Sequence, residues 1–296
     1  MGNVTRKGID VSAWQDTVNW DVVKKHVDFV IIRAGYGQNH IDSQFKRNQA
    51  ECERLGIPYG VYWFSYALTE ADAKREANFC CDLLENHNPT YPVCFDYEYD
   101  SFNYAVRNHA DVTQKSLVAI AKAFLKQVEK RGYYAMNYSN PDFLNRGFSE
   151  LKKYDLWLAH WGVKKPSREC GIWQSTSHHT VPGIKGFVDR DFAYKDYPAI
   201  IKEMNNNKYA AIVNEILDGK WGNGEERKAK LRDAGYPYAT IQELVNKKII
   251  ACNNVAHEVI EGLWGNGEER KVKLEKAGYP YHFVQSLVNA YLKAGK

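Results

Sequence analysis

Short apolar runs and helical patterns alternate along about the first 200 residues of the chain. Eight runs rich in β-branched and aromatic residues have the length of buried strands. They are residues 8–14, 29–37, 59–67, 91–99, 133–139, 155–161, 171–176 and 187–194. Helical periodicity separates the earlier runs, most clearly over 113–132, whereas the last three runs follow one another closely. This α/β pattern predicts an irregular eight-stranded β/α barrel whose later helices are short or missing.

An internal repeat follows the barrel pattern. Residues 217–246 return as 260–289, with the string WGNGEERK unchanged, so that the period is 43 residues. Glycines end two helical segments in each copy, and a Tyr-Pro pair precedes a third, so each copy predicts a small three-helix bundle. We therefore expect a barrel at 1–200, a polar linker at 201–208, a first repeat at 209–250 and a second repeat at 251–296.

Composition excludes several classes of protein. The chain is 44% hydrophobic and 26% charged, as globular proteins are. No apolar run approaches the ~18–20 residues of a membrane helix, which argues against membrane insertion. The excess of 40 Lys and Arg over 36 Asp and Glu is too small and scattered for a nucleic-acid binder. Aromatic residues make up 14% of the chain, which suits ligands with apolar faces such as sugars, or else fills the core.

Cysteine usage and the N-terminus bear on location. The six cysteines show no CxxC or Cys/His zinc spacing, which indicates free buried thiols in a reducing cytosol and no metal site. The first residues lack the apolar segment of a signal peptide. We expect synthesis in the cytoplasm, no cofactor, and release to an external substrate by another factor.

Four carboxylates are predicted to meet at one rim of the barrel. Chemistry in such barrels lies at the carboxyl ends of the strands. Asp96 and Glu98 alternate in the fourth predicted strand, with Asp100 next, and Asp10 and Asp189 lie in the first and last strands, which are neighbours in a closed barrel. Because like charges raise the pKa of one partner, the cluster could supply the acid and the base of glycosidic cleavage. A metal site or incidental structural acids are the alternatives.

Neighbouring side chains give weaker signals. His160 follows the sixth predicted strand and indicates either a substrate-positioning or a packed residue. Cys94 shares a strand face with Asp96, but no His motif is present to activate it, so it is assigned to the core. The absence of His from that strand, and of alternating Asp and Asn from the loops, argues against a metal.

The repeats offer rings and hydrogen-bonding groups but no nucleophile, which predicts a tandem binding module. The alternative is that the rings form the core and the charged groups pair with one another. The shared positions are Trp221 and Trp264, Asn223 and Asn266, Arg227 and Arg270, Tyr238 and Tyr281, and Gln242 and Gln285.

Five segments in this order resemble glycoside hydrolase family 25, the Chalaropsis-type lysozymes that are common among phage endolysins. They are GIDVSAWQ, FDYEYD, LWLAHWG, IWQST and GFVDRD, within residues 8–197. The pattern D-x-x-F-x-x-N at Asp42, Phe45 and Asn48 also fits. WGNGEERK and AGYPY resemble the cell-wall-binding repeat of a pneumococcal phage lysozyme, whose family binds peptidoglycan.

The resemblance implies an N-acetylmuramidase that cleaves the β-1,4 bond between MurNAc and GlcNAc. By position, Glu98 would be the proton donor, and Asp96 would stabilise positive charge or orient the substrate's N-acetyl group. Asp10 and Asp189 would tune this pair and hold the sugar. Asp191 departs from the family, where Asn is more common, and would either raise a neighbouring pKa or face outward. Rim aromatics would be sugar platforms or packing: Tyr66, Tyr138, Trp161 and Trp173.

The leading hypothesis from the sequence is a phage endolysin with a cutting barrel and two wall-binding repeats, released through a holin lesion. A bacterial autolysin, a wall-binding protein with an inactive barrel and a chitinase are the alternatives. The intact set of four acids argues against an inactive barrel, and the peptidoglycan-type repeats argue against chitin.

Overall fold

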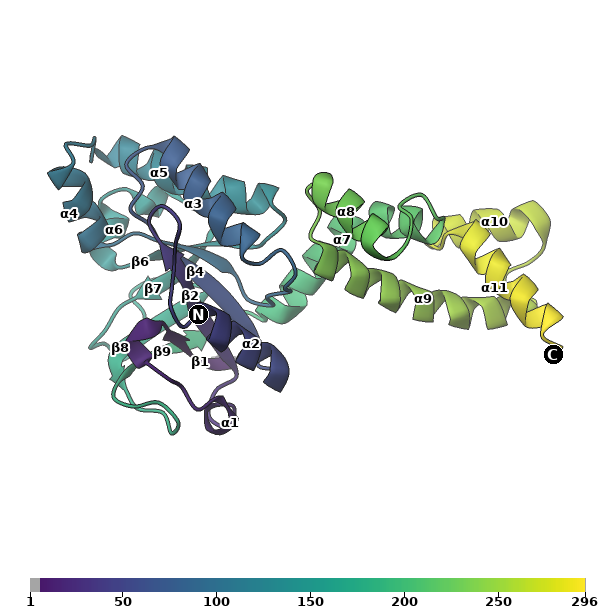
Figure 1. The fold of residues 1–296 in the computed structure, drawn as a ribbon, viewed down its shortest axis with the longest axis horizontal. Coiled ribbons are helices and arrows are strands. Elements are labelled where there is room, and N and C mark those ends of the chain that lie inside the picture. Colours follow the sequence, from purple (N-terminus) through teal and green to yellow (C-terminus); the bar gives the residue numbers. More distant parts are fainter. Residues whose placement is uncertain (1–5, 296) are drawn as a thin grey trace. The chain divides into compact units, whose positions relative to one another are not determined.

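The computed structural model describes residues 6–295, which form two compact units that divide after Lys202. The first unit is a closed barrel of eight strands, as predicted, with the short strand β3 (His40–Ile41) added as a hairpin on β2 (Figure 1). The barrel strands are β1 (Arg6–Val11), β2 (Phe29–Tyr36), β4 (Tyr59–Phe64), β5 (Val93–Asp96), β6 (Ala135–Ser139), β7 (Asp155–Ala159), β8 (Ile172–His179) and β9 (Val188–Ala193).

The barrel closes through β1, which pairs with β2 on one side and β9 on the other. Neighbouring barrel strands are parallel except that β9 runs antiparallel to both β8 and β1. A parallel connection needs a crossover of a dozen or more residues, whereas the loop from β8 to β9 is too short for one. The last strand therefore enters the barrel as the second arm of a hairpin.

Helical segments cover the barrel, and the later ones are short, as the sequence predicted. They are η1 (Ala13–Gln15), α1 (Trp20–Val23), α2 (Phe45–Leu55), α3 (Glu70–Asp82), α4 (Tyr99–Arg107), α5 (Gln114–Lys130), α6 (Pro141–Asn145) and η2 (Phe148–Glu150). Helices α3 and α5 lie side by side over β4, β5 and β6 (Figure 1). Within the described residues, no helix separates β7 from β8 or β8 from β9.

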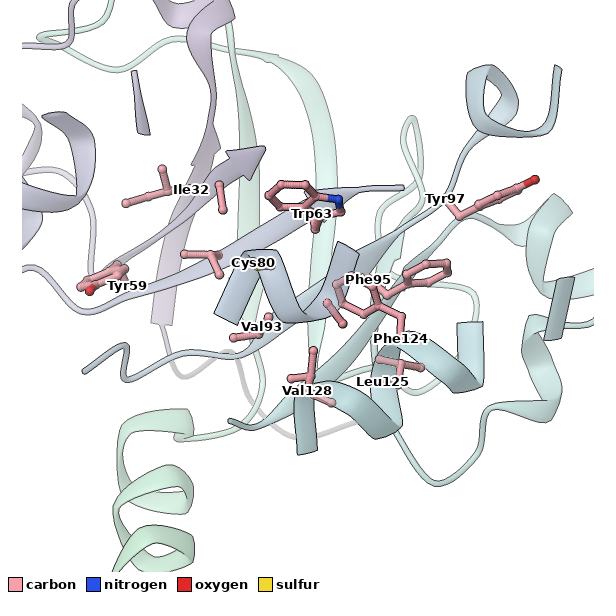
Figure 2. Close-up of a cluster of buried hydrophobic side chains, with 14 of the residues drawn as sticks. Ile32, Tyr59, Trp63, Cys80, Val93, Phe95, Tyr97, Phe124, Leu125 and Val128 are labelled. Atoms are coloured by element: carbon pink, nitrogen blue, oxygen red, sulfur yellow. The ribbon is translucent and has the colours of Figure 1, made fainter. Parts of the chain in front are cut away.

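Helix α5 is anchored by one apolar face. Its start is capped by the Thr113 hydroxyl, which accepts a hydrogen bond from the Ser116 amide at 3.3 Å. The Phe124 ring then packs on Phe95 of β5 with ring centroids 5.1 Å apart, and Trp63 lies in the same cluster (Figure 2). All three side chains are fully buried, so this layer fixes the carboxyl ends of β4 and β5 from outside the barrel.

The D-x-x-F-x-x-N pattern has a structural explanation. Asp42 accepts hydrogen bonds from the amides of Ala13 and Gln44, at 3.0 and 2.9 Å. Phe45 is buried, and the buried Asn48 Oδ1 accepts from Trp20 Nε1 at 3.1 Å. The pattern therefore ties the start of α2 to η1 and α1.

We expect Asn48→Ala to lower the free energy of unfolding by about 1–3 kcal/mol, because the buried indole N–H of Trp20 would lose its acceptor. Urea unfolding followed by tryptophan fluorescence measures this. The exposed Asn103 of α4 provides the control, since Asn103→Ala should change stability by less than ~0.5 kcal/mol. Equal effects from the two substitutions would contradict the interpretation.

The second unit is entirely helical between its turns. Its helices are α7 (Tyr197–Leu217), whose first residues belong to the first unit, α8 (Gly224–Asp233), α9 (Tyr238–Ile260), α10 (Gly267–Lys276) and α11 (Tyr281–Lys293). The predicted linker at 201–208 is not a break, because α7 runs through it. The three asparagines there are only moderately unfavourable in a helix, and no Gly or Pro interrupts them.

Two apolar clusters divide the second unit. Tyr209, Val213, Ile216, Leu231, Ile241 and Val245 bring together α7, α8 and the first half of α9. The second half of α9 packs with α10 and α11 through Cys252, Val255, Val259, Leu274, Val284 and Val288. One continuous helix thus serves as the third helix of the first repeat and the first helix of the second. In residues 6–295, none of the helices combines the length and apolar character that crossing a membrane requires.

Candidate active site

A cavity of about 280 Å³ opens at the carboxyl ends of the parallel strands, and it contains all four predicted acids. Its lining consists of Asp10, Trp14, Arg33, Tyr62, Phe64, Asp96, Glu98, Tyr138, Trp157, Trp161, Gln174, Ser177 and Asp189. The structure therefore brings together side chains from both ends of the first unit's sequence. Most of the lining is either ionisable or aromatic.

Strand register positions three of the acids. Asp10 on β1 lies directly opposite Asp189 on β9. Asp96 is the last residue of β5 and lies between Phe64 of β4 and Tyr138 of β6. Because residues in register point to the same face of a sheet, these side chains all project into the barrel mouth.

Glu98 is positioned by a turn and not by a strand. β5 ends at Asp96, and Glu98 is the N-cap residue of α4, where its amide donates to Ser101 Oγ at 3.2 Å. The expectation that Asp96, Glu98 and Asp100 alternate along one strand is therefore wrong in its geometry. Asp100 lies on α4 outside the pocket and accepts a hydrogen bond from the Tyr66 hydroxyl.

Burial, more than mutual repulsion, raises the pKa values of the four acids. Burial, with a contribution from the charge of Asp189, raises the pKa of Glu98 to about 7. Burial raises the pKa of Asp189 to about 6. The pKa of Asp96 is raised by burial and by Glu98, against the opposing charge of Arg33, and the pKa of Asp10 is raised mainly by burial. The pocket consequently retains protons that exposed carboxyls would release near pH 4.

Two of the predicted aromatic platforms line the cavity. Trp161 is 51% exposed, and its Nε1 donates to Gln174 Oε1 at 3.1 Å. The hydroxyl of Tyr138 donates to the same oxygen at 3.1 Å. Gln174, which was not predicted as a site residue, therefore fixes both rings.

The other three predicted substrate residues lie outside the cavity lining. Trp173 points to the opposite side of β8 from Gln174, packs on Phe192 and donates through Nε1 to the His160 carbonyl at 2.9 Å. The ring of His160 is also absent from the lining. Tyr66 packs edge-on against Tyr104 and bonds to Asp100. These contacts give Trp173 and Tyr66 a packing role.

An exposed tryptophan beside the acids was not predicted. Trp14 in η1 lines the cavity and is 83% exposed. The Ser12 hydroxyl accepts from the Trp14 amide at 3.2 Å, and Asp42 holds the adjacent Ala13 amide. Asp42 also pairs with Arg33 at 2.7 Å. The signal was present in the segment GIDVSAWQ, but nothing in its pattern distinguishes an exposed ring from a buried one.

Asp191 points into the barrel, which decides between its two predicted placements. It is fully buried, and its Oδ1 accepts from Trp157 Nε1 at 2.8 Å. Burial raises its pKa to about 7. All six cysteines are free and buried, and no group of three or more His, Cys, Asp and Glu side chains within residues 6–295 is arranged to hold a metal ion.

The shared polar residues of the repeats bond mainly to one another. The Arg227 guanidinium donates to the Gly222 carbonyl, Gln242 Oε1 and Asn223 Oδ1, at 3.0, 3.3 and 2.7 Å. Arg270 makes the same three bonds to Gly265, Gln285 and Asn266, at 3.0, 3.1 and 3.0 Å. Trp221 and Trp264 each donate to a glutamate of the preceding helix, Glu215 and Glu258. Tyr238 and Tyr281 are half-buried against the apolar clusters.

We expect Gln242→Ala to lower the free energy of unfolding of the first repeat by about 1 kcal/mol, because the part-buried Arg227 loses an acceptor. Gln285→Ala should have the same effect on the second repeat. Amide hydrogen exchange in α8 and α10 resolves the two repeats. Asn246→Ala at the exposed end of this chain of bonds is the control and should have a smaller effect; an effect as large as that of Gln242→Ala would contradict a structural role for the arginine network.

Comparison with known proteins agrees with this architecture. Residues 9–184 match glycosyl hydrolases family 25, and residues 210–249 and 253–292 match the CW_7 repeat. The chain belongs to glycosyl hydrolases family 25.

Its relatives come from phages and bacteria. The lysozyme of Streptococcus phage Cp-7 is 31% identical over 206 residues, which is 64% of this chain and 55% of that protein. The solved modular autolysin LytC of Streptococcus pneumoniae is 30% identical with a TM-score of 0.56, over 64% of this chain and 46% of that one. The catalytic domain of endolysin ply40 from Listeria phage P40 is 27% identical with a TM-score of 0.53, over 66% and 96%. The chain thus matches about half the length of the first two relatives.

Proposed function

We propose that the protein is an N-acetylmuramidase that hydrolyses the β-1,4 bond between MurNAc and GlcNAc in peptidoglycan. The observation that carries this proposal is the Glu98 carboxyl, whose pKa is raised to about 7, in one cavity with Asp96 and the exposed rings of Trp14 and Trp161. A carboxyl that stays protonated beside other carboxylates is what acid-catalysed glycoside cleavage requires. Flat exposed rings suit the apolar faces of sugar units.

In the proposed reaction, Glu98 donates its proton to the glycosidic oxygen as the bond to the anomeric carbon breaks. Asp96 stabilises the positive charge at that carbon, or orients the substrate's N-acetyl group against it. Asp96 suits this role because its Oδ1 is buried and has no hydrogen-bond partner among the described residues. Water then supplies the hydroxyl of the new reducing end, and its proton passes to the carboxylates. Asp10 and Asp189 hold the sugar, and the charge of Asp189 contributes to the raised pKa of Glu98.

Mass spectrometry of the products released from purified Gram-positive sacculi tests the proposal. Fragments with reducing MurNAc ends should appear with the wild type and be nearly absent with Glu98→Gln. Glu70→Gln, at an exposed site in the first turn of α3, is the matched control and should behave as the wild type does. Reducing GlcNAc ends would indicate a glucosaminidase, and release from chitin in place of sacculi would indicate a chitinase. No release by any variant would leave a wall-binding protein as the better interpretation.

We further propose that the repeats bind peptidoglycan and that the protein acts as a phage endolysin released through a holin lesion. The match to the CW_7 repeat and the likeness to a phage lysozyme and a phage endolysin support this. The autolysin among the relatives supports a bacterial autolysin as the second candidate. Expression in a Gram-positive host with and without a holin separates them, because an endolysin should lyse the cells only when the holin is present.

A further inference from the structure

Two carboxyl groups meet beneath the proposed catalytic pair. Asp10 on β1 and Asp191 on β9 come from adjacent antiparallel strands, and each carboxyl affects the pKa of the other. Asp191 lies opposite Gly8, two residues before Asp10, so its side chain is on the same face of the sheet as that of Asp10. Asp10 is 5% exposed and Asp191 is fully buried. Solvent therefore does not separate the two groups.

Each carboxyl of the pair accepts a hydrogen bond from a neighbouring side chain, but one oxygen of Asp191 has no donor. Gln174 Nε2 donates to Asp10 Oδ2 at 2.8 Å, and Trp157 Nε1 donates to Asp191 Oδ1 at 2.8 Å. Asp191 Oδ2 is buried and receives no hydrogen bond from any described donor. Ionised carboxylates only accept hydrogen bonds, so two of them bond to each other only when one carries a proton.

The surroundings disfavour two negative charges at this position. One cation faces a larger number of acidic groups across the elements that pack around the pair. The cation is Arg33 of β2, and the acidic groups are Tyr62 of β4, Cys94 and Asp96 of β5, Glu98 before α4, Tyr138 of β6 and Asp189 of β9. A single shared proton keeps the net charge of the pair at −1.

We propose that Asp10 and Asp191 share one proton, and that Asp191 is a positioning residue that holds the Asp10 carboxyl in place for the reaction. The inference rests on the proposed function for the role of Asp10, but the shared proton itself does not. Asn can take the place of the Asp191 side chain, since the amide N–H of Asn can donate to Asp10 while its carbonyl accepts from Trp157. Asn thus preserves the geometry without a titratable proton, whereas Ala removes both bonds.

Thermal unfolding of the full-length protein detects the proton without any substrate. Burial raises the pKa of both groups in the folded state, that of Asp191 to about 7. The folded protein therefore binds protons that the unfolded chain has released, and this pair costs stability progressively as pH rises from about 4 to about 7. We expect the melting temperature of Asp191→Asn to rise relative to the wild type by roughly 3 °C per pH unit over this range.

Infrared spectroscopy gives a second readout. The C=O band of a protonated carboxylic acid should be present in the wild type at pH 6 and be reduced in Asp191→Asn. The exposed Asp21→Asn is the matched control and should leave both the band and the pH dependence of melting unchanged. A difference in melting temperature between Asp191→Asn and wild type that is the same at every pH, with an unchanged band, would overturn the shared proton.

Activity tests the positioning role. On soluble glycan fragments at pH 5, Asp191→Ala should lose about 10-fold or more in kcat, whereas Asp191→Asn should recover most of that loss. Equal loss in the two variants would overturn positioning by this hydrogen bond. If Asp191→Ala does not fold, recovery by Asp191→Asn is judged against the wild type, and a loss of 10-fold or more counts against the role. A wild type that cleaves no glycan would refute the proposed function, while the melting and infrared results would still decide whether the proton is shared.

Discussion

Glu98→Gln is expected to lower kcat for glycan cleavage by about 10²–10⁴-fold, because the amide occupies the same space but cannot donate a proton as an acid does. The pKa of about 7 for Glu98 sets the pH dependence of the wild type. Below that pH the carboxyl is protonated and active as a donor, and above it the rate should fall about tenfold per pH unit. Rates on soluble glycan strands from pH 5 to 9 measure both effects. The residual rate of Glu98→Gln should lack this alkaline decline.

Stability provides the control for this prediction. A buried carboxyl whose pKa is raised destabilises the fold as pH increases from about 4 towards 7, so Glu98→Gln should melt at the same temperature as the wild type or higher at pH 7. A loss of rate in a variant that is at least as stable cannot be attributed to unfolding. A variant that retained more than about a tenth of the wild-type rate would exclude Glu98 as the proton donor. Asp96→Asn would then be the next substitution to test.

The barrel was predictable because its strands are buried on both faces and read as short apolar runs, separated early on by well-marked helices. The convergence of Asp10 and Asp189 followed from closure alone, and the register confirms that they are direct neighbours. The place where β5 ends was not predictable from alternation, because FDYEYD has the same pattern whether it continues as a strand or turns into a helix. Ser101, three residues after Glu98, is a capping signal that could have located the turn.

The directions in which the side chains of β8 point could not be predicted from the sequence either. Successive side chains of a strand point to opposite faces, so Trp173 and Gln174 lie on opposite sides of β8. In a strand that is buried on both sides, however, either residue could face the barrel mouth. The aromatic ring of Trp173 was predicted to face the barrel mouth, whereas the structure places the amide of Gln174 there. The continuity of α9, in contrast, could have been inferred, since residues 238–260 contain neither Gly nor Pro. The boundary between the two repeats was predicted at residue 250 from the repeat period, although no helix-breaking residue is present there.

Removal of both repeats is expected to weaken binding to sacculi by about 100-fold or more while leaving cleavage of small soluble glycans within about twofold. A chain of residues 1–207 ends in the Asn-rich stretch of α7, after the buried Tyr197 and Ile201 that belong to the first unit. It stops before Tyr209, the first residue of the repeat cluster, so no apolar core is cut. Co-sedimentation with sacculi, and turnover of soluble fragments, measure the two quantities separately.

The shared helix α9 makes an intermediate chain possible. Residues 1–250 retain every buried residue of the first cluster, which ends at Val245, and lose the second cluster, which begins at Cys252. If each repeat binds the wall on its own, this chain should bind more tightly than 1–207 and more weakly than the full chain, and the second repeat should add more than its own affinity because it binds while already tethered. Full-length Glu98→Gln should bind as the wild type does, since the proposed wall contacts lie outside the barrel. Equal binding by all three lengths would assign wall affinity to the barrel and leave the repeats without a tethering role.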